Sequence, residues 1–186
     1  MSDATHLTTQ QLEAGLDEVR QAPADSGRLE MISRRPDIGA RELLDEGELD
    51  TTSGLVGDNW ATRGQQRTPP QEPNPDAQLT LMNSRSANLV AAGDRDRWAL
   101  AGDQLYVDFD LSEQNVPPGS RIAIGAAVVE VTAEPHPGCK KFVERFGMDA
   151  MLFVNSDTGK QLHLRGINTK VVQAGAIRVG DTVSKA

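Results

Sequence analysis

The sequence is poor in cysteine and in long apolar runs. Its one cysteine, Cys139, cannot form an internal disulfide, and one thiol with three scattered histidines cannot supply a cysteine-rich structural zinc site. No stretch of about 18 apolar residues is present. Residues 1–6 lack the basic and then apolar pattern of a signal sequence. We therefore expect a soluble, cytoplasmic protein that has no membrane partner.

Basic and aromatic side chains are also scarce. The chain has 19 Lys and Arg against 27 Asp and Glu, so its formal net charge is −8. This balance argues against a nucleic-acid partner, because non-specific binding depends on neutralising phosphates, but it does not exclude a local basic pocket. With four Phe, two Trp and one Tyr in 186 residues, we expect one domain with a core of Val, Ile, Leu and Ala.

The N-terminal residues predict a helix. Thr8 and Gln11 have the spacing of a capping box and precede an apolar face, which indicates a helix over residues 8–20. We expect residues 1–27 to form a helical extension and residues 28–186 to form the main domain.

The segment that follows contains few clear elements. Residues 28–33 predict a short strand with Leu29 and Met31 on one side, and the acidic stretch 40–49 favours a second helix. Residues 57–76 hold four prolines and almost no apolar side chains, so they predict a long loop. That loop is either an exposed connector or a mobile flap over a site.

The second half of the chain is β-like. The alternation over residues 104–111 predicts a strand with one buried face and leaves Tyr106 and Asp108 on the solvated face. Short strands at regular spacing, separated by glycine turns, favour a closed barrel over a layered α/β sheet. We therefore expect a mainly β fold with flanking helices (α+β). Further strands are expected over residues 121–124, 127–131, 161–165 and 176–183.

Cys139 follows a proline-rich loop and precedes a predicted helix. Phe142 and Phe146 are spaced i, i+4, and Gly147 suits a helix C-terminus, so residues 140–146 predict a short helix. The thiol then lies at the N-terminus of this helix or one residue before it.

This setting favours a reactive thiol. The helix N-terminus together with His136, Lys140 and Lys141 would lower the pKa of Cys139, and a thiolate attacks sulfur donors and ligates soft metals. The alternative is a buried, inert cysteine, against which the flanking Pro, Gly and Lys residues argue. His163 alternates with leucines and is expected to face solvent from a strand.

Several short motifs occur in one order along the chain: residues 54–58, 79–85, 118–125, 128–132, 137–142, 165–168 and 175–183. In this order they resemble the MOSC-domain family, the domain shared with the C-terminal part of molybdenum-cofactor sulfurases. The resemblance covers roughly residues 28–184 and identifies Cys139 with the family's signature cysteine. One departure is Gly138, which separates Cys139 from the proline that the family often places directly before the cysteine.

The resemblance implies a MOSC-type β-barrel, similar to the pyruvate kinase β-barrel, with flanking helices. It implies that Cys139 is the catalytic residue and either carries sulfur as a persulfide, received from a cysteine desulfurase or another donor, or ligates the molybdenum of a pterin cofactor. In the second case five further residues would line the pocket of this anionic small molecule: His136, Lys140, Lys141, Arg165 and Asn168.

Three functions stay open at this point: a persulfide carrier, a molybdenum-dependent reductase of N-hydroxylated compounds, and a non-catalytic small-molecule-binding barrel in which Cys139 is incidental. The resemblance to the family also implies pyridoxal-phosphate binding. Because no strand–helix phosphate cup is evident in the sequence, we do not expect pyridoxal-phosphate catalysis by this chain alone.

Overall fold

Short strands and short helices make up the computed structural model, which describes residues 5–186. The strands are β1 (Ser26–Arg34), β2 (Glu42–Leu44), β3 (Glu46–Asp50), β4 (Gly54–Leu55), β5 (Leu79–Asn83), β6 (Leu105–Asp108), β7 (Arg121–Ile124), β8 (Ala127–Val131), β9 (Ile167–Gln173), β10 (Gly175–Arg178) and β11 (Thr182–Lys185). The helices are α1 (Thr9–Ala14), α2 (Leu16–Arg20), α3 (Ser84–Val90), α4 (Lys140–Phe146), α5 (Met148–Asn155) and α6 (Asp157–Gln161). Three 3₁₀ helices span Arg63–Gln66, Pro75–Ala77 and Arg95–Ala101.

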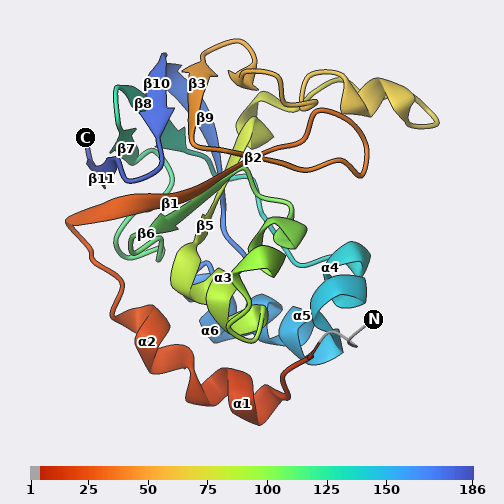
Figure 1. Cartoon of the computed structure of the whole chain (residues 1–186), viewed down its shortest axis with the longest axis vertical. Helices are drawn as coiled ribbons and strands as arrows, with labels where there is room; N and C mark the ends of the chain where they lie inside the picture. The colour runs from red at the N-terminus through yellow and green to blue at the C-terminus, as the bar shows by residue number, and fades with distance from the viewer. Residues whose placement is uncertain (1–4) are drawn as a thin grey trace.

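Seven strands close into a mixed barrel, as the sequence predicts. Their order is β1-β11-β7-β8-β9-β5-β6, and β6 pairs with β1 again. All neighbours are antiparallel except β5 and β6, which are parallel. Strand β2 extends the sheet beyond β1, and β10, β3 and β4 form a separate three-stranded sheet. The six helices lie together at one end of the barrel (Figure 1).

Gly27 lies where the barrel closes. It pairs with Val183 of β11, and a Cβ at this position would lie 1.9 Å from the carbonyl oxygen of Asp108 in β6. Only glycine leaves room for the two neighbouring strands to approach β1 this closely.

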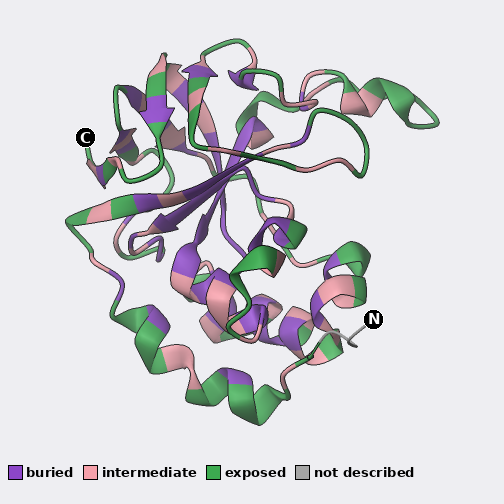
Figure 2. Cartoon of the chain, in the orientation of Figure 1, coloured by how far each residue is buried: buried purple, intermediate pink, exposed green. Residues whose placement is uncertain are grey.

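The apolar side chains form two cores. One core fills the barrel and is aliphatic apart from Phe109, which agrees with the low aromatic content of the chain. The other core lies between the barrel and the helices and holds most of the aromatic side chains. Figure 2 shows β5 and β6 as buried almost throughout, whereas β1 is exposed near its start. Strands that separate the two cores are therefore buried on both faces.

Strand β6 is such a strand, so the prediction that one of its faces is solvated was wrong in part. Leu105 and Val107 point into the barrel, while Tyr106 is fully buried on the helix side. The Tyr106 hydroxyl donates a 2.7 Å hydrogen bond to the Trp98 carbonyl, which satisfies its only polar group. Asp108 is partly exposed and pairs with Arg85.

Other local predictions are confirmed. The helix over residues 140–146 is α4, and Gly147 is its C-cap. Strands β7 and β8 turn at residues 125–126, and β1 contains the predicted strand 28–33. The predicted strand 176–183 is divided into β10 and β11 by a turn.

Two predicted elements were wrong. The stretch 40–49 forms strands β2 and β3 rather than a helix, because pairing with β1 and β10 outweighs the helix propensity of its acidic residues. Residues 161–165 are not a strand: they contain the end of α6 and a turn, in which His163 has a φ of 48°. His163 therefore does not face solvent from a strand.

The N-terminal predictions need smaller corrections. The helix expected over 8–20 is capped by Thr8 and Gln11 as predicted, but it breaks at Gly15 into α1 and α2. Leu29 and Met31 lie in different cores, because the register between β1 and β6 shifts between them. A β-bulge of this kind inserts an extra residue into one strand, so residues two apart no longer share a face.

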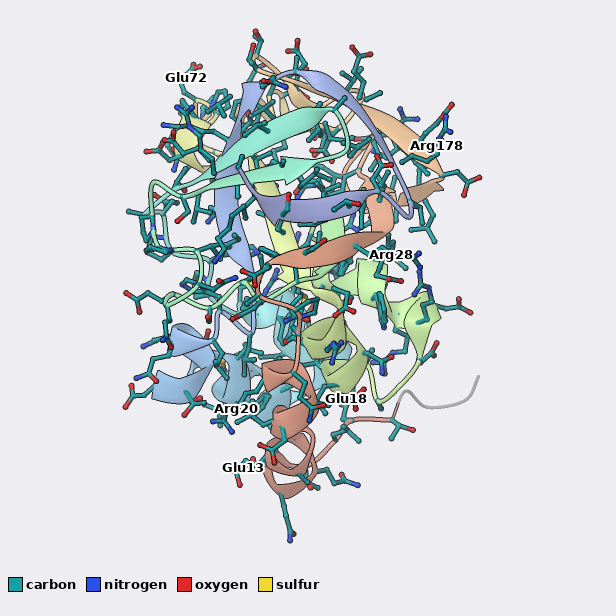
Figure 3. The ribbon with its side chains drawn as sticks, turned by 90° about the vertical axis from the view of Figure 1, so that its left-hand side faces the viewer. Glu13, Glu18, Arg20, Arg28, Glu72 and Arg178 are labelled. Carbon is teal, nitrogen blue, oxygen red and sulfur yellow. The ribbon has the colours of Figure 1, made fainter. Side chains whose placement is uncertain are left out.

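Residues 57–76 form the predicted long loop, which contains the 3₁₀ helix Arg63–Gln66 and ends in the 3₁₀ helix Pro75–Ala77. Charged side chains on the outside of the molecule include Glu13, Glu72 and Arg178 (Figure 3).

Within residues 5–186, no helix is long and apolar enough to cross a bilayer.

Candidate functional site

Cys139 is exposed at the N-cap of α4. Its carbonyl oxygen accepts hydrogen bonds from the main-chain N–H groups of Phe142 (2.9 Å) and Val143 (3.1 Å). Phe142 and Phe146 fix the helix to the core, with their ring centroids 4.8 Å apart. The thiol thus stands at the surface on a helix whose other side is held rigidly, which confirms the predicted position and excludes a core cysteine.

The residue before Cys139 is held by α5. The Gly138 N–H donates to Asn155 Oδ1 at 2.8 Å, and Asn155 Nδ2 donates to the Gly138 carbonyl oxygen at 3.2 Å. Asn155 therefore binds both the main-chain N–H and the carbonyl oxygen of Gly138, and so positions the segment that carries Cys139.

Cys139 lies on the wall of a cavity of about 710 Å³, here called the cationic pocket. Basic side chains reach it from the chain after β1, from the long loop, from α4 and from the turn before β9. Eight of them line it: Arg35, Arg41, Arg63, Arg67, Lys140, Lys141, Arg145 and Arg165. Two acidic side chains, Asp37 and Glu134, also line it. This excess of positive charge favours an anionic ligand.

Arg35 is held by a buried carboxylate. Its guanidinium makes a bidentate pair with Asp58, with Nε–Oδ2 and Nη2–Oδ1 distances of 2.9 and 2.8 Å, and Nη1 donates to the Gly102 carbonyl oxygen. The Asp58 side chain is fully buried and also accepts from two main-chain N–H groups. Such a fork-like pair fixes the position of an arginine on the pocket wall.

A second buried carboxylate, Asp103, joins His136 to Arg165. Asp103 Oδ1 lies 2.7 Å from His136 Nε2, and Asp103 Oδ2 accepts from Arg165 Nη1 at 2.5 Å. Burial alone would raise the pKa of Asp103, but the charge of Arg165 and the contact with His136 hold it far below its usual value. Asp103 is therefore ionised at neutral pH.

The ionised Asp103 determines the tautomer of His136. Burial and the positive charge of Arg165 lower the pKa of His136, although Asp103 opposes this effect, so the ring is neutral at pH 7. Because a carboxylate only accepts, His136 Nε2 carries the proton and Nδ1 is an unprotonated acceptor.

The arginines of the cationic pocket repel one another. Burial and the positive charges of Arg145 and Arg35 lower the pKa of Arg41. Burial and Arg35 likewise lower the pKa of Arg63. An anion among these groups would relieve that repulsion.

Two further groups complete the wall. Asn168 Nδ2 donates to the carbonyl oxygens of Glu134 (3.2 Å) and Pro135 (3.1 Å), so it holds the segment that leads to Cys139. Arg165 has a buried Nε–H that no acceptor among residues 5–186 satisfies.

The structure brings all the predicted site residues to the cationic pocket: His136, Cys139, Lys140, Lys141, Arg165 and Asn168. Arg35, Arg63 and Arg67 are not among the predicted site residues, and all three line the pocket. Arg34, by contrast, pairs with Glu42 at the surface.

The sequence did not identify Arg41, Arg145, Asp103 or Asn155. No local pattern marks Asp103, because its role follows from contacts with residues 33 and 62 positions away.

These features describe a closed mixed β-barrel with an exposed thiol on the wall of an anion-attracting pocket. The family model of the MOSC domain matches residues 68–184, and the chain belongs to this family.

Solved structures share the fold. The YuaD protein from Bacillus subtilis is 19% identical with a TM-score of 0.61, over 85% of this chain and 94% of that one. YiiM from Escherichia coli is 20% identical with a TM-score of 0.54, over 86% of this chain and 69% of that one. YiiM from Geobacillus stearothermophilus is 14% identical with a TM-score of 0.53, over 86% and 73%. A comparison with curated proteins finds no match.

Proposed function

We propose that the cationic pocket binds a phosphorylated molybdenum–pterin cofactor and that the Cys139 thiolate is the protein's ligand to the metal. The observation that carries this proposal is the position of an exposed thiol on the wall of a pocket with eight basic and two acidic side chains. A soft thiolate suits molybdenum, and the surrounding positive charge suits phosphate.

The donor groups of the chain fit such a cofactor. Among residues 5–186, no group of three or more His, Cys, Asp or Glu side chains is placed to hold a metal ion. A single thiolate is sufficient when the metal arrives already coordinated by its cofactor. The buried Nε–H of Arg165 is an unused hydrogen-bond donor on the same wall. When bound, the cofactor would supply two-electron redox chemistry at its metal.

Other residues of the chain would bind the anionic groups of the cofactor and hold a proton near it. Arg35, held by Asp58, and the loop arginines Arg63 and Arg67 would bind the anionic groups. Neutral His136 offers an acceptor nitrogen and, when it takes up a proton, a donor. In this proposal Asp103 keeps a proton on His136 Nε2 whether the ring is neutral or charged, so that only Nδ1 gains or loses one.

A persulfide carrier is the second candidate, and the exposure of Cys139 favours it. An exposed thiolate can reach the active site of a cysteine desulfurase, attack the outer sulfur of the donor's persulfide and take that sulfur, while the donor leaves as a thiolate. The cationic pocket is not needed for this reaction, which separates the two candidates.

The first experiment measures molybdenum and pterin in the protein purified from a host that makes the cofactor. We expect both in the wild type, loss of molybdenum in Cys139→Ser, and loss of both in the Arg63→Gln/Arg67→Gln double variant. The matched control is Arg121→Gln/Arg178→Gln, which removes two exposed charges outside the pocket. It should retain both components.

Wild-type protein without molybdenum or pterin would contradict the cofactor proposal. A cysteine desulfurase with its substrate then tests the second candidate. The mass of one added sulfur on Cys139 would support a carrier, and an unmodified thiol would leave only the non-catalytic barrel.

A further inference from the structure

A second cavity lies on the other side of the segment that carries His136. It has a volume of about 540 Å³, within the range of small-molecule sites, and is here called the rear cavity. Its walls come from the end of β8, from α5 and α6, from the start of β9 and from residues 132–137. Cys139 does not line the rear cavity. Five residues line both cavities and form the partition between them: Glu134, Pro135, His136, Arg165 and Asn168.

The rear cavity differs from the cationic pocket in charge. Two acidic and two basic side chains line it, Glu113 and Glu134 against Lys160 and Arg165. Balanced charge does not attract an anion as the cationic pocket does. A neutral ligand is therefore the better match.

Rigid apolar side chains form much of the wall. Three are prolines, Pro118, Pro135 and Pro137, and Val131 and Ile167 continue the same surface. Proline rings lose almost no side-chain entropy when a ligand covers them. A pocket that combines such walls with a few polar groups is suited to a planar organic molecule.

The two histidines on the wall each offer an acceptor. His163 Nδ1 lies 2.7 Å from the Leu111 carbonyl oxygen and must carry the proton there, so neutral His163 has an unprotonated Nε2. His136 has an unprotonated Nδ1, because its Nε2 donates to Asp103. Both histidines line the rear cavity, so these two ring nitrogens are the histidine acceptors available on its wall to a ligand with N–H donors.

His163 also has an unusual backbone. Its φ of 48° is positive, which is uncommon for residues other than glycine, although histidine tolerates it better than most. Residues held in such conformations are concentrated at ligand sites, where the surrounding structure stabilises them.

We propose that the rear cavity is a second binding site, for a small, neutral, planar molecule that donates N–H hydrogen bonds to His163 and His136. This site goes beyond the cofactor proposal and does not depend on it, because the rear cavity is formed by the chain alone.

The test uses indole and 1-methylindole with the full-length, cofactor-free protein. Indole is planar and neutral and has one N–H, and 1-methylindole has none. In a titration followed by ¹H–¹⁵N NMR, we expect saturable shifts at the Gly159 and Gly166 amides, which line the rear cavity. We expect 1-methylindole to bind about three- to tenfold more weakly, the effect of one neutral hydrogen bond.

Two variants test where indole binds. His163→Asn keeps a residue type that tolerates the left-handed region but removes the ring, and it should weaken indole binding by about the same factor. Arg178→Gln, at an exposed position outside the rear cavity, is the control and should bind indole like the wild type. The amide spectrum shows whether each variant is folded.

Three outcomes would overturn the proposal: no saturation at the solubility limit of indole, shifts confined to the cationic pocket, or equal affinity for the two probes. A folded His163→Asn variant that binds indole like the wild type would also overturn it.

Discussion

Asp103→Asn is the substitution that tests the buried network most directly. It replaces a fully buried carboxylate by a neutral amide of the same shape. The contacts with His136 and Arg165 lose their ionic partner, and the Arg165 guanidinium, whose side chain is 8% exposed, keeps its charge without a carboxylate. The structure therefore predicts a loss of stability although the shape of the side chain hardly changes.

The magnitude follows from the burial of Arg165. Removing one partner of a buried ion pair lowers the free energy of unfolding by about 3–5 kcal/mol. In a domain of this size, about 1 kcal/mol changes Tm by about 2–4 °C. We therefore expect Asp103→Asn to lower Tm by about 6–20 °C. The double variant Asp103→Asn/Arg165→Met removes the unpaired charge as well, so its loss should be smaller than the sum of the two single losses.

Chemical denaturation and calorimetry measure these differences. Glu46→Gln is the matched control, because it makes the same carboxylate-to-amide change in an exposed pair with Arg178 and should leave Tm almost unchanged. A loss below about 1 kcal/mol for Asp103→Asn, the value of an exposed ion pair, would refute the reasoning. Strict additivity in the double variant would refute the coupling of Asp103 and Arg165.

Three further predictions concern single side chains. Asn155→Ala removes two hydrogen bonds to Gly138. The Gly138 amide hydrogen should then exchange faster with solvent, and the rate at which Cys139 is alkylated should change. Unchanged hydrogen exchange at Gly138 would contradict the role of Asn155. The pKa of His136 is lower in the folded protein than in the unfolded chain, so the unfolded chain binds a proton at His136 more tightly. The free energy of unfolding should therefore fall as the pH drops below about 6.5. His136→Gln should reduce this dependence of the free energy on pH, measured by urea titrations at several pH values. Tyr106→Phe leaves a buried carbonyl without its donor and should lower the free energy of unfolding by about 1–3 kcal/mol, and an unchanged denaturation midpoint would show that the bond contributes nothing.

Local patterns in the sequence predicted those elements whose cause is local. The helix α4 follows from the spacing of two phenylalanines and a terminal glycine, and strands β6, β7 and β8 follow from alternation and a glycine turn. These signals need no knowledge of distant parts of the chain.

The errors arise where distant contacts decide the structure. Residues 40–49 have helix-forming side chains, but β1 and β10 offer them strand partners. Tyr106 follows a correct alternation, yet the helices cover the face that was expected to be solvated. Burial on both sides of a strand cannot be recognised from period-two alternation when the second core is formed by helices elsewhere in the sequence.

The part of the candidate site that lies near Cys139 in the sequence was predicted, and the distant part was not. The residues near Cys139 in sequence carry a local signal, because prolines, glycine and lysines surround the thiol. Arg35 and Arg41 lie about a hundred positions earlier, and only the closure of the barrel and the path of the loop bring them to the same cavity. Their function is a property of the topology.

The distribution of charge decides which anion the protein can accept. Eight of the 19 basic side chains line the cationic pocket with two of the 27 acidic ones, and Asp58 and Asp103 are buried against two of its arginines. This leaves 11 basic and 23 acidic side chains elsewhere. At physiological ionic strength, charges are screened over about 8 Å, so an anion inside the pocket interacts with its arginines far more than with the acidic exterior. A nucleic acid extends well beyond that distance and would lie against acidic surface. This distribution of charge therefore supports the proposed compact phosphorylated ligand beside Cys139 over a long polyanion.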